Sequence, residues 1–137
     1  MTYAGDVTPT EAYAAVTGPE DALLVDVRTR AEWTYVGVPV LEGAHLDVAF
    51  VEWSTFPEGR LNDRFVDEVR AAGLEPGRPV YLLCRSGVRS KAAADALTAA
   101  GLGPAFNVLE GFEGPHDDSG HRTVAGWKVA GLPWRQG

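Results

Sequence analysis

Three short segments rich in apolar residues constrain the fold more than any other feature of this sequence. They occupy residues 22–28 (ALLVDVR), 80–84 (VYLLC) and 106–111 (FNVLEG). A short, almost continuously apolar run is typical of a strand that is buried on both faces of a parallel sheet. Since segments with helical spacing separate these runs, we predict an α/β fold with a mostly parallel sheet and helices on both of its faces.

Capping residues predict where the helices begin and end. Thr8, Pro9 and Glu11 mark the start of a helix that Gly18 ends, with Thr8 and Glu11 forming a capping box. Asn62 is the predicted N-cap of a helix that ends at Gly73, and the alanine-rich segment 89–101 is the strongest helix pattern. A short helical turn is predicted within 30–37, and a further strand within 45–53.

Composition limits the classes of protein that this chain can belong to. With 137 residues, we expect a single domain over residues 1–137. The formal net charge of -7 argues against nucleic acid or an anionic membrane as a partner, and no apolar run is long enough to span a bilayer. The single cysteine forms no internal disulfide, and the first residues do not resemble a signal peptide, so we expect a cytoplasmic location.

The segment CRSGVRS, residues 84–90, places that cysteine between the end of a strand and the start of a helix. Gly87 allows successive backbone N–H groups to turn inward, and the helix N-terminus adds positive potential. Arg85 and Arg89 add guanidinium groups that match oxyanions. This surrounding favours the thiolate form of Cys84, so the pattern predicts a sulfur nucleophile inside an anion cradle rather than a structural cysteine.

This loop resembles the active-site loop of the rhodanese sulfurtransferases. LLVDVRTRAEW (residues 23–33) is similar to the N-terminal signature of that family, and VLEGFEG and GWKVAGLPW are similar to the later parts of single-domain bacterial members. The resemblance begins near Thr8 and continues to the end of the chain. It implies a rhodanese-like fold with a sheet of about five strands.

The resemblance also implies the reaction. Thiosulfate, or a similar donor, transfers its outer sulfur to Cys84, and cyanide or a thiol, including a thiol on a protein, accepts that sulfur from the persulfide. Cys84 is then the catalytic residue, and no metal or organic cofactor is expected. The residues implied to bind the donor are Arg85, Ser86, Gly87, Val88, Arg89 and Ser90.

Two other functions are compatible with the sequence. A cysteine phosphatase or arsenate reductase has a similar loop, but with five residues between cysteine and arginine, whereas Cys84 and Arg89 have four between them. The shorter loop leaves less room for a tetrahedral phosphate. A non-catalytic rhodanese-like binding module is the other alternative, although such modules usually lack the cysteine that this chain retains.

Several residues outside the loop are candidates for supporting roles. Asp26 and Arg28 follow a strand, and we interpret them as an ion pair that supports the loop from behind the donor-binding residues. Trp127 and Trp134 are expected to anchor the C-terminal segment. We also expect one of Trp33 and Trp53 to lie near the mouth of the site, together with Phe112, His121 and Arg122.

Overall fold

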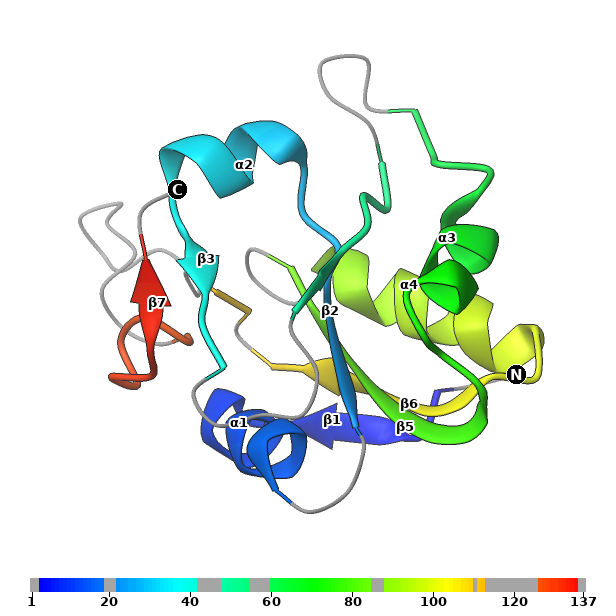
Figure 1. Cartoon of the computed structure of the whole chain (residues 1–137), viewed down its shortest axis with the longest axis horizontal. Helices are drawn as coiled ribbons and strands as arrows, with labels where there is room; N and C mark the ends of the chain where they lie inside the picture. Colours follow the sequence, from blue (N-terminus) through cyan, green and yellow to red (C-terminus); the bar gives the residue numbers. More distant parts are fainter. Residues whose placement is uncertain are drawn as a thin grey trace.

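Five parallel strands form the main sheet in the order β1-β6-β5-β2-β4, which confirms the predicted α/β fold (Figure 1). The computed structural model describes residues 3–18, 22–41, 48–54, 60–84, 88–109, 111–112 and 126–135. The elements in chain order are β1 (Gly5–Val7), α1 (Pro9–Thr17), β2 (Leu23–Asp26), α2 (Arg30–Tyr35), β3 (Val38–Pro39), β4 (Ala49–Phe50), α3 (Phe65–Ala71), β5 (Pro76–Leu83), α4 (Val88–Ala99), β6 (Gly103–Val108) and β7 (Trp134–Arg135).

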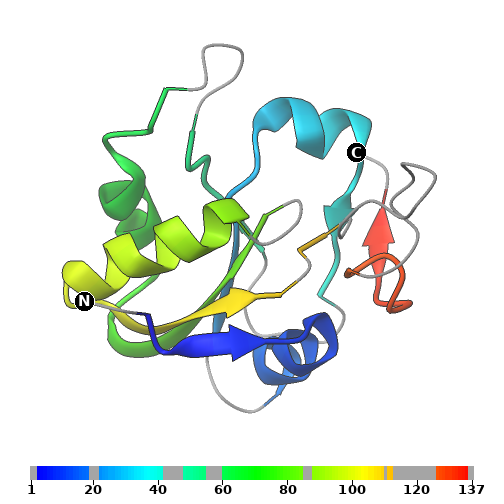
Figure 2. The same cartoon turned by 180° about the vertical axis from the view of Figure 1, so that it is seen from behind.

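Each face of the sheet carries its own apolar cluster, because alternate residues of a strand point to opposite faces. Leu82 of β5 packs with residues of α3 and α4, whereas Leu83 packs with residues of α1 and with Trp127. The two views in Figure 1 and Figure 2 show α1 and α4 on opposite sides of the sheet. Helices therefore cover both faces, as predicted. Within the described residues, no helix combines the length and apolar character needed to cross a bilayer.

The predicted start of α1 is confirmed in detail. The side chain of Thr8 accepts a hydrogen bond from the backbone N–H of Glu11 at 3.1 Å, and the Glu11 carboxylate accepts one from the Thr8 N–H at 2.9 Å. These reciprocal bonds satisfy two N–H groups that have no partner within the helix. Pro9 is the first helical residue, where its missing N–H costs nothing.

The predicted N-cap at Asn62 is wrong. Helix α3 begins at Phe65 after Arg64, and its N-cap makes no side-chain hydrogen bond. The Asn62 side chain instead donates to the backbone oxygen of Glu52 at 2.8 Å and accepts from the Arg64 N–H at 3.1 Å. The Asn62 side chain, which the sequence pattern assigned to the start of α3, therefore makes a tertiary hydrogen bond to Glu52 instead.

A second, two-stranded sheet lies outside the main sheet, and the sequence pattern did not indicate either of its strands. In β3 and β7, Val38 pairs with Arg135 and Pro39 with Trp134 in an antiparallel ladder. Figure 1 shows this pair beside α2, away from the five-stranded sheet. A strand of two residues has no detectable alternation, so only the contact between distant parts of the chain creates it. The predicted strand within 45–53 is reduced to β4, and residues 42–47 lie outside the described residues.

Gly37 holds the β3–β7 pair close to the buried end of β2. Its φ is 120°, and a Cβ added there lies 2.8 Å from the Trp134 ring and 2.9 Å from the Arg135 oxygen. Its backbone oxygen also accepts a hydrogen bond from Arg28 Nη2 at 2.8 Å. The position therefore needs both the conformational freedom and the small size of glycine.

We expect Gly37→Ala to lower the free energy of unfolding more than Gly73→Ala. Gly73 has a similar φ of 117° but nothing within 4 Å of an added Cβ, so it isolates the backbone strain. That strain costs roughly 1–2 kcal/mol at either site. The contact with β7 should add about 1–3 kcal/mol at Gly37 alone. Urea unfolding of both variants measures the difference, and equal losses would show that β7 does not pack as described.

Candidate functional site

The carboxyl ends of β2 and β5 lie side by side and place Asp26 next to the start of the cysteine loop. Asp26 pairs with Leu83 in the parallel register, and the Val27 N–H donates to the Leu83 oxygen at 2.8 Å. Cys84 follows directly, and its backbone oxygen accepts from the Phe112 N–H at 2.8 Å. In parallel α/β sheets, ligands bind beyond this edge. The fold therefore places the cysteine where a site is expected.

The thiol of Cys84 is buried under the first turn of α4. The residue is 1% exposed and belongs to the apolar cluster between the sheet and α4. Its Sγ lies 3.2 Å from the Ser90 Oγ, also fully buried, which is the distance of a hydrogen bond to sulfur. Ser90 thus brings a polar group to the sulfur from the first turn of α4.

Part of the predicted anion cradle lies outside the described residues. Arg85, Ser86 and Gly87 are not described, and of Val88 only its place as the first residue of α4 is given. The inward-turned N–H groups of this loop therefore remain a prediction. Arg89 and Ser90 are described, and both carry interactions that the sequence did not reveal.

Arg89 forms a two-pronged ion pair with Glu32 of α2. Its Nη1 donates to Glu32 Oε1 at 2.7 Å and its Nη2 to Oε2 at 2.9 Å. The side chains are only 27% and 18% exposed, so solvent screens the pair less than it screens a surface pair. This fork fixes the first turn of α4 against α2 and uses two of the five N–H donors that a guanidinium carries.

The pair changes the pKa of both of its members. Burial favours the neutral acid of Glu32, but hydrogen bonding and charge from Arg89, with bonds from Thr29, outweigh it and hold the pKa of Glu32 below its usual value. Hydrogen bonding to Glu32 raises the pKa of Arg89 despite burial, and the charge of Cys84 adds to that rise. Arg89 is therefore close enough to Cys84 for their charges to interact.

Glu32 is the main site residue that the sequence analysis missed. Its carboxylate also accepts from the backbone N–H of Thr29 at 3.2 Å, and it completes a capping box at the start of α2. The spacing of Thr29 and Glu32 is visible in the sequence as a capping signal. The second role, toward Arg89, depends on how α2 packs and has no sequence signal.

Asp26 and Arg28 form a fully buried ion pair at the end of β2. Arg28 Nη2 lies 2.7 Å from Asp26 Oδ2, both side chains are 0% exposed, and Arg28 Nε donates to Asp26 Oδ1 at 3.0 Å. The guanidinium also lies 4.2 Å from the ring centre of Phe112. Among the described residues, Arg28 Nη1 has no hydrogen-bond partner. The pair links β2 to Gly37 and Phe112, which agrees with a supporting role.

The aromatic residues are distributed between the core and the surface. Trp127 is fully buried against α1 and the sheet, and its indole N–H donates to the Pro133 oxygen at 2.8 Å, so it anchors the C-terminal segment as predicted. Trp134 is 39% exposed in β7 and meets Phe112 edge to face. Trp53 packs edge to face on Phe65 in the core. His121 and Arg122 lie outside the described residues.

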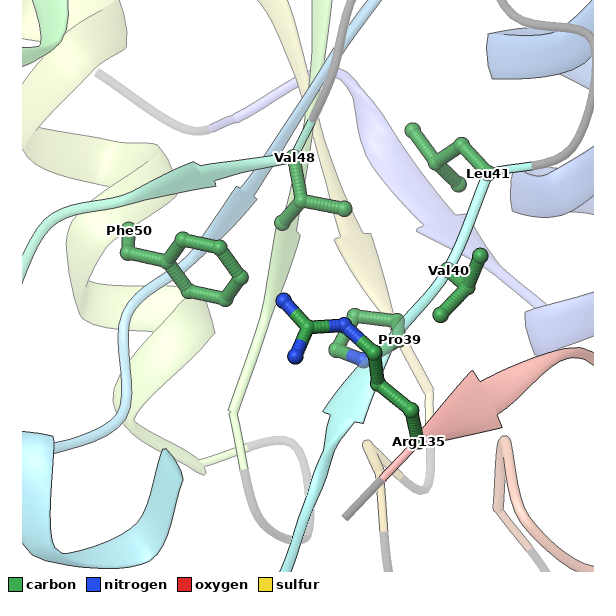
Figure 3. A pocket seen from close by; sticks show the side chains of 6 residues that line it. All are labelled: Pro39, Val40, Leu41, Val48, Phe50 and Arg135. Atoms are coloured by element: carbon green, nitrogen blue, oxygen red, sulfur yellow. The ribbon is translucent and has the colours of Figure 1, made fainter. Parts of the chain in front are cut away.

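The hollows described on the surface lie beside β4 rather than over the thiol. Figure 3 shows one of them, with the Arg135 guanidinium reaching between Phe50 and Pro39 toward Val48. A second hollow shares Phe50 and Arg135 and is also lined by Trp33, and a third shares Phe50 and Trp33. Cys84 lines none of these three hollows. In the described part of the chain, Trp33 thus borders a hollow that is separate from the thiol.

Comparison with known proteins agrees with this architecture. The family model described as "Rhodanese-like domain" matches residues 8–118. An uncharacterised protein of Rickettsia conorii is 35% identical over 134 residues, covering 95% of this chain and 96% of the relative. The crystal structure of Rv0390 from M. tuberculosis has 51% identity and a TM-score of 0.89, covering 99% of this chain and 100% of that chain.

Two more distant structures share the fold. A rhodanese-like domain protein from Staphylococcus aureus is 21% identical with a TM-score of 0.57, covering 78% of this chain and 86% of that chain. The structure of a polysulfide-sulfur transferase homodimer from Wolinella succinogenes is 20% identical with a TM-score of 0.63. It covers 97% of this chain and 78% of that chain. At this level of identity, the likeness shows the fold alone.

Glu32→Gln is expected to lower the free energy of unfolding by about 1–3 kcal/mol, because it leaves the half-buried Arg89 without a charged partner. The matched control is Asp67→Asn, which removes the carboxylate of the exposed pair with Arg70, at 3.7 Å. That change should cost less than about 0.5 kcal/mol. Chemical denaturation of the two variants at neutral pH makes the comparison, and equal effects would argue against a stabilising Glu32–Arg89 fork.

The stabilising effect of this pair should also depend on pH. Because the pKa of Glu32 is lower in the folded protein than its ordinary value of 4.5, its contribution is complete above that value. It is lost as the pH falls through the folded pKa. The stability difference between the wild type and Glu32→Gln should therefore shrink on acidification, which denaturation at a series of pH values measures. A difference that grows toward low pH contradicts the assignment.

Proposed function

Because this chain belongs to the rhodanese-like domain family, we propose that it transfers the outer sulfur of thiosulfate, or a similar donor, to an acceptor through a persulfide on Cys84. The observation that carries the proposal is the position of Cys84. It follows β5 at the carboxyl edge of a parallel sheet and meets Ser90 in the first turn of α4. A nucleophile at a strand end and helix start is well placed to receive an anion.

The proposed reaction has two half-reactions, in both of which atoms and charges balance. The Cys84 thiolate attacks the outer sulfur of thiosulfate, the sulfur–sulfur bond of the donor breaks, and sulfite leaves with the bonding electron pair. The product is an anionic persulfide on Cys84. Cyanide then attacks the outer sulfur, forming thiocyanate and restoring the thiolate. Since no second cysteine exists in the chain, an external acceptor must complete the cycle.

The two arginines of the loop have different roles in this proposal. Arg89 is held by Glu32, so it contributes positive potential close to the sulfur and fixes the loop on α2. Arg85 is assigned the larger part in attracting the donor, together with the N–H groups of residues 85–90. A thiol, including one on a protein, takes the place of cyanide in the cytoplasm, where we place the reaction. Polysulfide, the substrate named for the W. succinogenes neighbour, is a second donor to test.

Incubation with thiosulfate should add the mass of one sulfur atom to the wild-type protein and none to Cys84→Ser. Intact-mass spectrometry measures the addition, and subsequent cyanide should remove it while thiocyanate appears. Turnover in the cyanide assay should fall to background in the variant, since no other cysteine can replace the nucleophile.

The same preparations distinguish the alternatives. Hydrolysis of para-nitrophenyl phosphate by the wild type without any added sulfur would favour a phosphatase. If the folded protein neither hydrolyses the phosphate nor takes up sulfur from thiosulfate or polysulfide, that result would favour a binding module. Turnover by Cys84→Ser equal to that of the wild type would contradict the proposed persulfide.

A further inference from the structure

A chain of polar side chains connects the buried thiol to β1, the outermost strand on one side of the sheet. From Cys84, the chain passes to Ser90 of α4 at 3.2 Å, then by a short hydrogen bond to Asn107 Oδ1 of β6. Asn107 Nδ2 in turn donates to Asp6 Oδ1 of β1 at 3.0 Å. Asp6 also accepts from the Tyr3 hydroxyl at 2.7 Å. We name Cys84, Ser90, Asn107 and Asp6 the buried relay, although Asp6 itself is exposed.

The register of the sheet explains why these residues meet. Asn107 is paired with Asp6 across the β1–β6 ladder. Asn107 lies two residues beyond Ala105, so the side chains of Asn107 and Ala105 point to the same face of the sheet, which α4 covers. Ser90 lies in the first turn of this helix. Asn107 and Ser90 are both 0% exposed. Buried polar groups of this kind need their hydrogen bonds, so the directions of those bonds are strongly constrained.

The carboxylate of Asp6 fixes the direction of every bond in the relay. An ionised carboxylate can only accept, so Asn107 must turn its NH₂ group toward Asp6 and its Oδ1 toward Ser90. Hydrogen bonds from Asn107 and then Tyr3 lower the pKa of Asp6, which keeps it ionised. Ser90 has a single hydroxyl proton, and Asn107 Oδ1 receives it. The Ser90 oxygen therefore faces the sulfur with a lone pair.

This direction favours one protonation state of the sulfur. A lone pair on Ser90 accepts a hydrogen bond from a thiol, but it repels a thiolate. A Ser90 hydroxyl that rotated to donate to an ionised sulfur would leave the buried Asn107 Oδ1 without its donor. We propose that Asn107, acting through Ser90, is a positioning residue that opposes ionisation of Cys84, because it keeps the Ser90 hydroxyl from donating to the sulfur.

Other charged groups act on the sulfur from the elements around it. Arg89 of α4 favours the ionised form, although Glu32 of α2 shares its charge. Asp26 and Arg28, on the neighbouring strand end, form a pair with each other. Arg85 lies outside the described residues. Lys91 of α4 acts on Asp6 and helps to keep it ionised.

The relay therefore opposes the cationic groups, and the balance between them sets the ionisation of Cys84. The role of the relay in sulfur transfer rests on the proposed function, in which the relay opposes formation of the thiolate nucleophile. The ionisation itself can be measured without any sulfur donor, so the two proposals can fail separately.

The test is a pH titration of the thiolate absorbance in the ultraviolet, with Cys84→Ser subtracted as the baseline. Asn107→Leu keeps the approximate shape but removes the acceptor, so Ser90 can donate to the sulfur. The midpoint of thiolate formation should move to lower pH by about half a unit to one unit, a three- to tenfold change in the ionisation constant. The same substitution in a Ser90→Ala background should produce no shift of the midpoint, because the hydroxyl that connects Asn107 to the sulfur is absent.

Asp6→Asn tests the relay from its exposed end. Without the carboxylate, the Asn107 amide can reverse and donate to Ser90, so the midpoint should again fall, and Ser90→Ala should reduce that fall. Asp95→Asn is the matched control, because Asp95 accepts from the Tyr3 N–H at 3.0 Å but, among the described contacts, does not touch Asn107. Its effect on the midpoint should be the same with and without Ser90.

Two results overturn the proposal: an unchanged midpoint in folded Asn107→Leu, or a shift that persists undiminished without Ser90. The second result indicates a direct electrostatic effect or a general loosening of the core. Should Asn107→Leu fail to fold, the comparison of Asp6→Asn with and without Ser90 decides the question. If the midpoint shifts as expected but no persulfide forms, the proposal about the relay stands. That result contradicts only the proposed reaction.

Discussion

The parallel pairing of β2, β5 and β6 is the constraint on which the rest of the structure depends. Because the three strands run in the same direction and in fixed register, their carboxyl ends meet at one edge. This brings Asp26, Cys84 and Asn107 together from positions far apart in the chain. The strands hold this register because both faces are buried, and a slip by one residue would move apolar side chains to the wrong face. The chemistry of the site therefore depends on the same burial that stabilises the fold.

Four charged side chains that the structure describes near this edge form two ion pairs. Asp26 with Arg28 and Glu32 with Arg89 form two ion pairs, the first fully buried and the second partly buried. A buried pair contributes little net stability compared with apolar packing, but removing one member is costly. The pairs therefore act mainly as geometric constraints. The first ties β2 to Gly37 and Phe112, and the second ties the start of α4 to α2, on both sides of the cysteine loop.

The thiol lies between two opposing influences that come from different elements. Arg89 provides positive potential, which favours an anion at this position. The hydroxyl of Ser90, committed to Asn107, presents its oxygen lone pair to the sulfur and favours the neutral thiol. Such a balance responds to small changes, because rotation of the Ser90 hydroxyl reverses the dipole that this group presents to the sulfur. In the proposed reaction, this gives the chain a way to form its nucleophile as a donor arrives.

The sequence by itself determined the class of fold, the α1 capping box and the position of Cys84 between a strand and a helix. These depend on local spacing, which short-range physics decides: apolar runs make buried strands, and capping residues end helices. The tertiary structure decided which charges meet, because Glu32 and Arg89 are 57 residues apart and Asn107 and Asp6 are 101 apart. It also decided the β3–β7 pair and the tertiary use of Asn62, where a contact across the chain outweighs a local preference.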